Sequence, residues 1–318
     1  MTTVTPLERY RWMARIREFE LACIAGVATG EVHGELHTGI GQEAIAAGMA
    51  GVLRTDDALV STHRNHAHGL VKGTDPRALL AEIYERSTGL CGGYGGHMHP
   101  FDPGTNFSAT GIVGASLPVA LGYAYAMRLE GRDGVAVAVT GDAGSNHGTF
   151  HECMTMAAAW ELPLLIVVEN NSYGISVSSE DVIPTATIAE RAVAYDCVGE
   201  TIDGTDAEVV AEAFARLVQE TRRDPAPCVL EATCFRFQGH YEGDAQTYRT
   251  KDEHERIRRD GDPLLIARER LTAAGTADAA ALDAIDGEAH AEMQALLASV
   301  REDPMPDPAR ALDHVFAA

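Results

Sequence analysis

The sequence lacks the features of a membrane-spanning or secreted protein. No apolar run approaches the roughly 20 residues that a helix needs to cross a bilayer. The first ten residues contain neither the basic stretch nor the apolar core of a secretory signal. The six cysteines form no Cys-x-x-Cys pair, and three of them stand in apolar stretches, as reduced core residues do. We therefore expect a cytoplasmic protein that does not associate with a membrane.

Basic residues are scarce in this chain. There are 25 lysines and arginines against 47 aspartates and glutamates, which gives a net charge of −22. Such a charge repels nucleic acid and anionic membrane surfaces, so we expect no nucleic acid partner. The sequence also contains no internal repeat and no low-complexity linker. It describes a soluble chain with an acidic surface, and its 46% of apolar residues are ample for a core.

Helical and strand patterns alternate along most of the chain. Helix signals cover residues 6–29, 76–87, 114–128, 146–160 and 206–221, whereas buried strand patterns start near residues 58, 135, 164, 197 and 228. This alternation predicts an α/β fold, a parallel sheet flanked by helices on both faces. We expect one α/β domain over residues 1–262. Residues 263–318, which are alanine-rich and acidic, should form a helical C-terminal extension of that domain.

Polar side chains follow two neighbouring strands of the predicted sheet. Asp142 ends a valine-rich strand, and Asn171 follows the next strand, 29 residues later. Because the carboxyl ends of parallel strands meet at one edge of the sheet, both side chains should emerge where α/β proteins bind ligands. Mg²⁺ takes one or two protein oxygens and completes its octahedron with phosphate and water oxygens. The pair predicts Mg²⁺ held on a diphosphate; the alternative is a helix-capping aspartate in a turn.

Gly141-Asp142 followed by Asn170-Asn171 resembles the thiamine diphosphate motif. The surrounding segments are similar to the α subunits of the heteromeric 2-oxo acid dehydrogenases and their acetoin dehydrogenase relatives. The resemblance runs from about Leu7 to about Leu271. It includes Ile16-Arg-Glu-Phe-Glu20, His37, Gly41-Gln-Glu-Ala44, Gly111-Ile-Val-Gly114, Gly239-His240 and Tyr248-Arg249. It implies the thiamine diphosphate-binding fold, with thiamine diphosphate and Mg²⁺ as cofactors.

The resemblance also implies roles for particular residues. Asp142 and Asn171 would bind the metal through side-chain oxygens, and Tyr173 through its backbone carbonyl. Gly111 and Val113 would contact the aminopyrimidine and support the bent cofactor, unless they only form a tight strand-to-helix turn.

The run Thr62-His-Arg-Asn-His-Ala-His68 contains three histidines. The resemblance implies that His63 and Arg64 bind the cofactor's phosphates, arginine by charge-assisted hydrogen bonds. Two alternatives are structural histidines and a metal site, although no ordered set of further ligands accompanies the run.

Two other histidines are candidate acid–base groups. His240 would lie in a loop over the diphosphate, and His37 would lie in the active site ahead of the Gly-Gln-Glu-Ala segment. Histidine has an intrinsic pKa near neutrality, which suits proton transfer, and the alternative is a structural role for each. Tyr241 stands where some relatives carry a regulatory phosphoserine, so we expect that form of control to be absent.

The sequence departs from the family within the cofactor motif. Where relatives have glycine and then commonly alanine after the aspartate, this chain has Ala143 and then Gly144. If the turn still cradles the diphosphate, Ala143 must adopt a negative φ, and any left-handed residue must be Gly144. Ser145 or Asn146 would cap the helix that follows.

The implied protein is the α subunit of an enzyme that cleaves a C–C bond next to a carbonyl. In this family the glutamate that activates the cofactor lies on a β subunit, so an α₂β₂ heterotetramer is implied. Among the relatives, acetoin dehydrogenases look most similar, and pyruvate or branched-chain 2-oxo acids remain possible substrates. The fragment would pass to another protein, such as a lipoyl-bearing acyltransferase, or to a small acceptor. Alternatives are a two-component acyloin-forming ligase and, given Ala143, a non-catalytic scaffold subunit.

Overall fold

The computed structural model describes residues 4–315, apart from the side chain of His314. A seven-stranded sheet has the order β2-β3-β1-β4-β5-β9-β8, and its pairs are parallel except for β2 with β3. A small hairpin, β6-β7, lies outside it. The strands are β1 (Ala58–Ser61), β2 (Phe101–Asp102), β3 (Phe107–Ala109), β4 (Ala136–Gly141), β5 (Leu164–Asn170), β6 (Tyr173–Gly174), β7 (Val177–Ser178), β8 (Val198–Asp203) and β9 (Cys228–Thr233). The predicted α/β class is confirmed.

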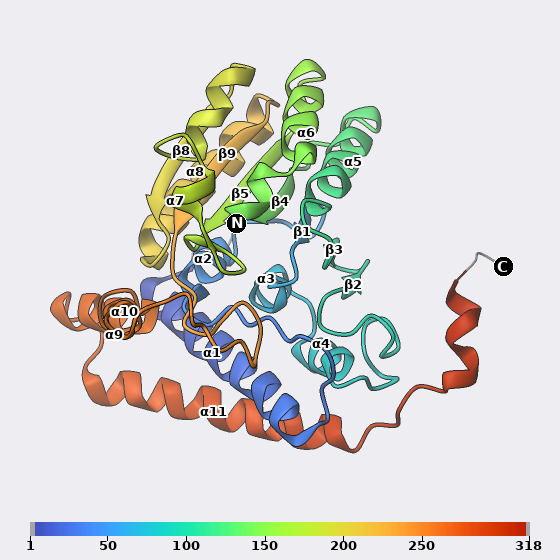
Figure 1. The fold of residues 1–318 in the computed structure, drawn as a ribbon, viewed down its shortest axis with the longest axis vertical. Helices are drawn as coiled ribbons and strands as arrows, with labels where there is room; N and C mark the ends of the chain where they lie inside the picture. The colour runs from blue at the N-terminus through green and yellow to red at the C-terminus, as the bar shows by residue number, and fades with distance from the viewer. Residues whose placement is uncertain (1–3, 316–318) are drawn as a thin grey trace.

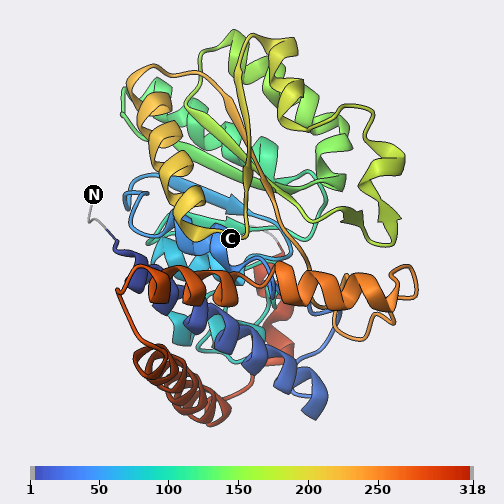
Figure 2. The ribbon, with the colours of Figure 1, turned by 90° about the vertical axis from the view of Figure 1, so that its left-hand side faces the viewer.

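Helices cover both faces of the sheet (Figure 1, Figure 2). Alternate residues of β4 and β5 face opposite sides: Ala138 and Ile166 pack under α5 (Ser116–Leu129) and α6 (Gly148–Ala159). Val139 and Val167 pack on the other side, with α2 (Glu43–Met49) and α8 (Ala207–Arg223). Both strands are continuously apolar because successive side chains point to opposite faces of the sheet and helices cover both faces.

A second group of helices lies beside the sheet, centred on α1 (Pro6–Thr29). Thr5 and Glu8 form a capping box at its start, and Gly30 ends it at a φ of 73°. Figure 1 shows α11 (Ala279–Arg301) running along α1, and Arg15 joins the two helices through an ion pair with Glu292 (2.7 Å).

The remaining helices are α3 (His66–Lys72), α4 (Pro76–Ile83), α7 (Ser179–Val182), α9 (Lys251–Asp260) and α10 (Pro263–Ala273), with 3-10 turns η1 (Ala143–Asn146), η2 (Ala189–Tyr195) and η3 (Pro308–His314).

Several predicted element boundaries were wrong. The helix expected from residue 146 starts at Gly148, because residues 143–146 form the 3-10 turn η1. Its N-cap is therefore His147, whose ring accepts from the backbone N–H of Thr149, and not Ser145 or Asn146. The helix expected over 76–87 ends at Ile83, since Glu85 takes a left-handed φ of 56°. Within the described residues, none of the helices is long and apolar enough to span a membrane.

Candidate functional site

The carboxyl edge of β4 and β5 carries the predicted site. Gly141 pairs with Glu169 in the sheet, so Asp142 and Asn171 leave the edge beside one another. A cavity of about 240 Å³ opens there. Nine of the eleven residues proposed from the sequence line it: His63, Arg64, Val113, Asp142, Ala143, Gly144, Asn171, Tyr173 and His240. The other two lie close by. His37 contacts His63 and His240, and Gly111 lies between the lining residues Thr110 and Ile112.

Two acceptor oxygens at this edge are buried without a partner. Asp142 is 2% exposed, and its Oδ2 makes no hydrogen bond. Asn171 is 6% exposed, and its Oδ1 makes no hydrogen bond either. The Asn171 amide donates to Gln42 Oε1 (3.2 Å), which leaves its oxygen free. Burial raises the pKa of Asp142 above its ordinary value. Unpaired buried acceptors cost free energy, so the pair fits a hard divalent cation, whose ligands are such oxygens.

The inverted Ala143-Gly144 pair lies in the turn η1 above these oxygens. Ala143 has a negative φ, as predicted, and Gly144, to which any left-handed conformation was assigned, has no positive φ, so this turn contains no left-handed residue at either position. Packing bears on Gly144 instead: a Cβ there would lie 2.4 Å from Thr140 Oγ1, so the Thr140 side chain would have to move. The methyl group of Ala143 points at Gly174, where an added Cβ would lie 2.5 Å from it. The glycine of the hairpin thus makes room for the alanine.

We expect Ala143→Gly to change cofactor affinity by less than about sixfold, because the methyl obstructs nothing and added glycine flexibility costs only about 0.5–1 kcal/mol. Gly144→Ala should weaken binding by about tenfold, since overpacking against Thr140 costs about 1–3 kcal/mol. Calorimetric titration of both variants with thiamine diphosphate and Mg²⁺ measures this. A gain of tenfold or more in Ala143→Gly would show that the natural alanine obstructs the site.

Two buried arginines face the cavity. Arg64 donates to the carbonyls of Thr38 (2.6 Å) and His240 (2.5 Å), and Arg236 donates to the carbonyl of Ile175 (3.0 Å). Burial and the neighbouring Arg236 lower the pKa of Arg64 to about 9, which leaves it charged at neutral pH. Neither guanidinium has a carboxylate within ion-pair distance among residues 4–315. Adjacent cations without counter-ions favour an anionic ligand such as a diphosphate.

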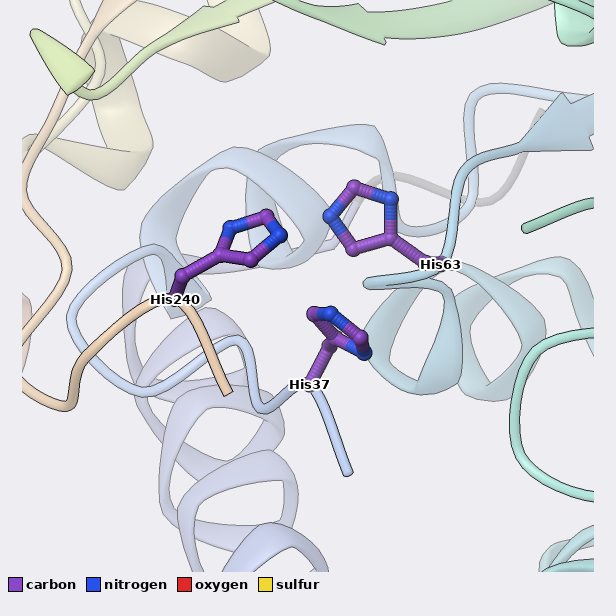
Figure 3. Close-up of side chains that lie close together, drawn as sticks. All are labelled: His37, His63 and His240. Carbon is purple, nitrogen blue, oxygen red and sulfur yellow. The ribbon is translucent and has the colours of Figure 1, made fainter. Parts of the chain in front are cut away.

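Three histidines meet at the mouth of the cavity (Figure 3). The ring centroid of His37 lies 4.5 Å from that of His63 and 4.8 Å from that of His240. Burial, with Arg64 as the next cause, lowers the pKa of His37 to about 2 and that of His240 to about 4. Their nitrogens therefore act at neutral pH as neutral donors and acceptors. This differs from the near-neutral titration expected of an isolated imidazole.

The other histidines of the run at residues 62–68 point elsewhere. His66 hydrogen-bonds Glu20 (2.8 Å), and His68 hydrogen-bonds the hydroxyl of Ser61 (3.0 Å). The run therefore does not form one metal site. The nitrogens of His37, His63 and His240 do lie within 4.8 Å of one another. The adjacent charge of Arg64 and Arg236 opposes a cation there.

Sequence reasoning missed two charged residues that line this cavity. Arg236 is 2% exposed, and Glu169 is a buried carboxylic acid whose pKa is raised by burial to about 7. Each is a charged residue within an apolar segment, Arg236 between two phenylalanines and Glu169 after five apolar residues. Because charge is costly to bury, this pattern is itself a signal of a buried polar site.

A parallel sheet whose carboxyl edge carries free acceptor oxygens and unpaired arginines defines an α/β protein that binds a phosphorylated ligand. Residues 11–309 match the family described as Dehydrogenase E1 component. The chain therefore belongs to this family, as an α subunit of the thiamine diphosphate-dependent 2-oxo acid dehydrogenases.

Three relatives illustrate the match. The α subunit of acetoin:2,6-dichlorophenolindophenol oxidoreductase from Cupriavidus necator is 37% identical over 315 residues, which cover 99% of this chain and 95% of that protein. The subunit of the same name from Bacillus subtilis is 40% identical over 254 residues, 80% of this chain and 76% of that protein. The pyruvate dehydrogenase E1 component α subunit of Rhizobium meliloti is 35% identical over 302 residues, 95% of this chain and 87% of that protein.

Proposed function

We propose that this chain is the α subunit of a Mg²⁺-dependent enzyme that cleaves the C–C bond next to a carbonyl in acetoin. The observation that carries the proposal is the pair of unpaired buried oxygens, Asp142 Oδ2 and Asn171 Oδ1, beside two arginines without counter-ions. The two oxygens suit the metal ion of a metal diphosphate, and the two arginines suit its phosphate groups. Relatives named for acetoin and for pyruvate are similarly close, and acetoin is preferred because the two relatives named for it are 37% and 40% identical, against 35% for the pyruvate-named subunit of Rhizobium meliloti.

Bound thiamine diphosphate supplies the carbanion chemistry, and the chain supplies position and charge. Asp142, Asn171 and the backbone carbonyl of Tyr173 would hold Mg²⁺. Arg64, with His63, would bind the phosphate oxygens. His37 and His240 would offer neutral hydrogen-bonding nitrogens to the substrate, and Val113, with Gly111 next to the cavity wall, would support the cofactor ring.

We propose that a β subunit covers this cavity in an α₂β₂ heterotetramer. Side chains at the mouth are apolar and exposed: Ile112 is 67% exposed and Ile175 59%. Exposed apolar residues continue along α5 and α6, where Tyr125 packs on Trp160 with ring centroids 5.3 Å apart. Exposed apolar side chains at the mouth of an open site favour a protein partner. The β subunit would bring the activating glutamate, and a lipoyl-bearing acyltransferase would be the acceptor of the fragment.

We place the enzyme in the cytoplasm. All six cysteines are free thiols, which suits a reducing compartment.

The test is turnover by the purified α and β chains, mixed with thiamine diphosphate, Mg²⁺ and an electron-accepting dye. We expect turnover of acetoin that exceeds turnover of pyruvate, and none from the α chain alone, because the activating group is on the partner. Appreciable turnover by the α chain alone would refute the proposed assembly. Acyloin formation by the complex without oxidation would identify the ligase instead, and no reaction with an intact cofactor site would identify a scaffold subunit.

A further inference from the structure

An arginine in η2 is bound to the turn η1, which lies at the end of β4. Arg191 donates from Nη1 to the backbone carbonyl (2.8 Å) and to the hydroxyl oxygen (3.1 Å) of Ser145. Its Nη2 donates to Oδ1 of Asn146 (2.7 Å). Within residues 4–315 these are all the hydrogen bonds of the guanidinium group. One side chain therefore connects η2 with both residues at the end of η1.

The contact with Ser145 continues to the backbone of Asp142. Ser145 is fully buried, and its hydroxyl group donates to the carbonyl oxygen of Asp142 (2.6 Å). The same hydroxyl oxygen accepts from Arg191, so two consecutive hydrogen bonds join the guanidinium group to the proposed metal ligand. The backbone N–H of Ser145 also donates to this carbonyl (3.2 Å). Arg191 is not among the residues that line the cavity, so it can act on a ligand there only through η1.

Glu231, in β9, holds η2 against the sheet. Its side chain is 1% exposed, and one of its oxygens accepts from the backbone N–H groups of Ile188 (2.7 Å) and Ala189 (3.0 Å), where η2 begins. Its other oxygen accepts from the side-chain amide of Asn170 (2.7 Å), the last residue of β5. The carboxylate therefore joins η2 to the strand end that Asn171 follows.

The two strand ends that carry the unpaired oxygens are thus connected through one short segment. We propose that Arg191, supported by Glu231, is a positioning residue for the metal site: it holds the end of β4 in place beside the end of β5. Mg²⁺ requires oxygen ligands at about 2.0–2.1 Å in octahedral geometry, so a small displacement of either end weakens its binding. Hydrogen bonds from a charged donor are about twice as strong as neutral ones, which suits this task. The inference rests on the proposed function, because it concerns the proposed Mg²⁺ site.

The same contacts have a competing explanation, in which η1 holds η2 and not the reverse. η1 follows directly from β4, the central strand of the seven, and leads into α6, so it has support of its own. If Arg191 only anchored its own segment, its loss would loosen residues 183–196 and leave η1 and the cofactor site unchanged. The two explanations therefore differ in which side of the contact responds when the guanidinium group is removed.

Hydrogen exchange of the full-length chain without ligands distinguishes the two explanations. In Arg191→Ala, the backbone N–H groups of Ser145 and His147, which bond within η1, should exchange about tenfold faster than in the wild type. Arg54→Ala is the matched control, since Arg54 also donates to the carbonyl and the carboxylate of one residue, Asp133, which lies before the start of β4. It should leave exchange in η1 unchanged. Faster exchange in Arg191→Ala that is confined to η2 would overturn the proposal.

Cofactor affinity tests the positioning role itself. In the complex with the β partner and Mg²⁺, Arg191→Ala should bind thiamine diphosphate about tenfold more weakly, because the bonds of a charged donor are lost. Arg191→Lys, which keeps a charged donor, should recover part of the loss, and Arg54→Ala should bind as the wild type does. In the Asp142→Asn background, Arg191→Ala should cost less than about threefold, since both changes act on the same ligand. Additive losses, or wild-type affinity in folded Arg191→Ala, would overturn the proposal.

Ser145→Ala decides the matter if Arg191→Ala does not fold. It removes the hydroxyl group that links Arg191 to Asp142 and keeps the carbonyl that Arg191 also binds. Affinity for thiamine diphosphate with Mg²⁺ should fall by about threefold to tenfold, the effect of one hydrogen bond, and an unchanged affinity would count against the proposal. If the wild-type complex bound no thiamine diphosphate with Mg²⁺, the proposed function would fail. The exchange rates of η1 would still show whether Arg191 positions this turn, because that measurement needs no cofactor.

Discussion

Replacement of Asp142 by asparagine should weaken Mg²⁺-dependent binding of thiamine diphosphate by on the order of 10-fold to 1000-fold, because the metal loses the one carboxylate proposed as its ligand. The neutral amide has nearly the same shape, and its oxygen can still face the cavity. The loss of affinity therefore measures the effect of the missing negative charge at residue 142 and not of a change in side-chain volume. Calorimetric titration of the complex between this chain and its β partner gives the affinity with and without Mg²⁺. In the absence of Mg²⁺ the difference between variant and wild type should largely disappear.

A matched control separates metal binding from stability. Asp57→Asn also neutralises a buried carboxylate, one that pairs with Arg222 (2.7 Å) and accepts from the backbone N–H of Val135 just before β4. It should lower the unfolding temperature while leaving cofactor affinity close to that of the wild type. By contrast, Asp142→Asn should be no less stable than the wild type without cofactor, because it removes an unpaired buried charge. Equal cofactor affinities for Asp142→Asn and the wild type would refute the metal assignment.

The sequence predicts the sheet and its ligand edge well because their signals are local. The apolar runs that begin at Val135 and Leu164 are strand-length and continuous, and each ends in a polar residue. In a parallel sheet such ends must share an edge, so the proximity of Asp142 and Asn171 follows from topology alone. The elements that ended at unexpected residues were those set by a backbone conformation, such as the left-handed Glu85 or the 3-10 turn at residues 143–146.

The polar surroundings of the site could not be read from the sequence in the same way. Histidine has an intrinsic pKa near 6.5, but the shift at His37 depends on Arg64, on His240 and on depth of burial, which the fold brings together. Arg236 and His97 are contributed by two different loops. No spacing along the chain marks them as neighbours of His240 and His37.

The effect of the inverted Ala143-Gly144 pair could be predicted only in part. From the sequence alone we considered the backbone conformation of the turn, since glycine is the residue that readily takes a positive φ. The structure shows a packing relation instead, in which Ala143 fills the space left by Gly174 in the hairpin that follows Asn171. Neither residue has a positive φ. A departure from the family pattern at one position is therefore accommodated 31 positions later in the chain.

Gly174→Ala should weaken cofactor binding by about 10-fold to 100-fold, since its methyl group would lie 2.5 Å from that of Ala143 and overpacking costs about 1–3 kcal/mol. Neither methyl can rotate away, so η1 and the hairpin must separate, which displaces the proposed ligands Asp142 and Tyr173.

The double variant Ala143→Gly/Gly174→Ala should bind as Ala143→Gly does, because the nearest remaining atom, the Cα of residue 143, lies 3.8 Å from the new methyl. Titration of all four proteins gives a coupling free energy, expected at about 1–3 kcal/mol. Additive losses in the double variant would mean that the two residues do not pack against one another.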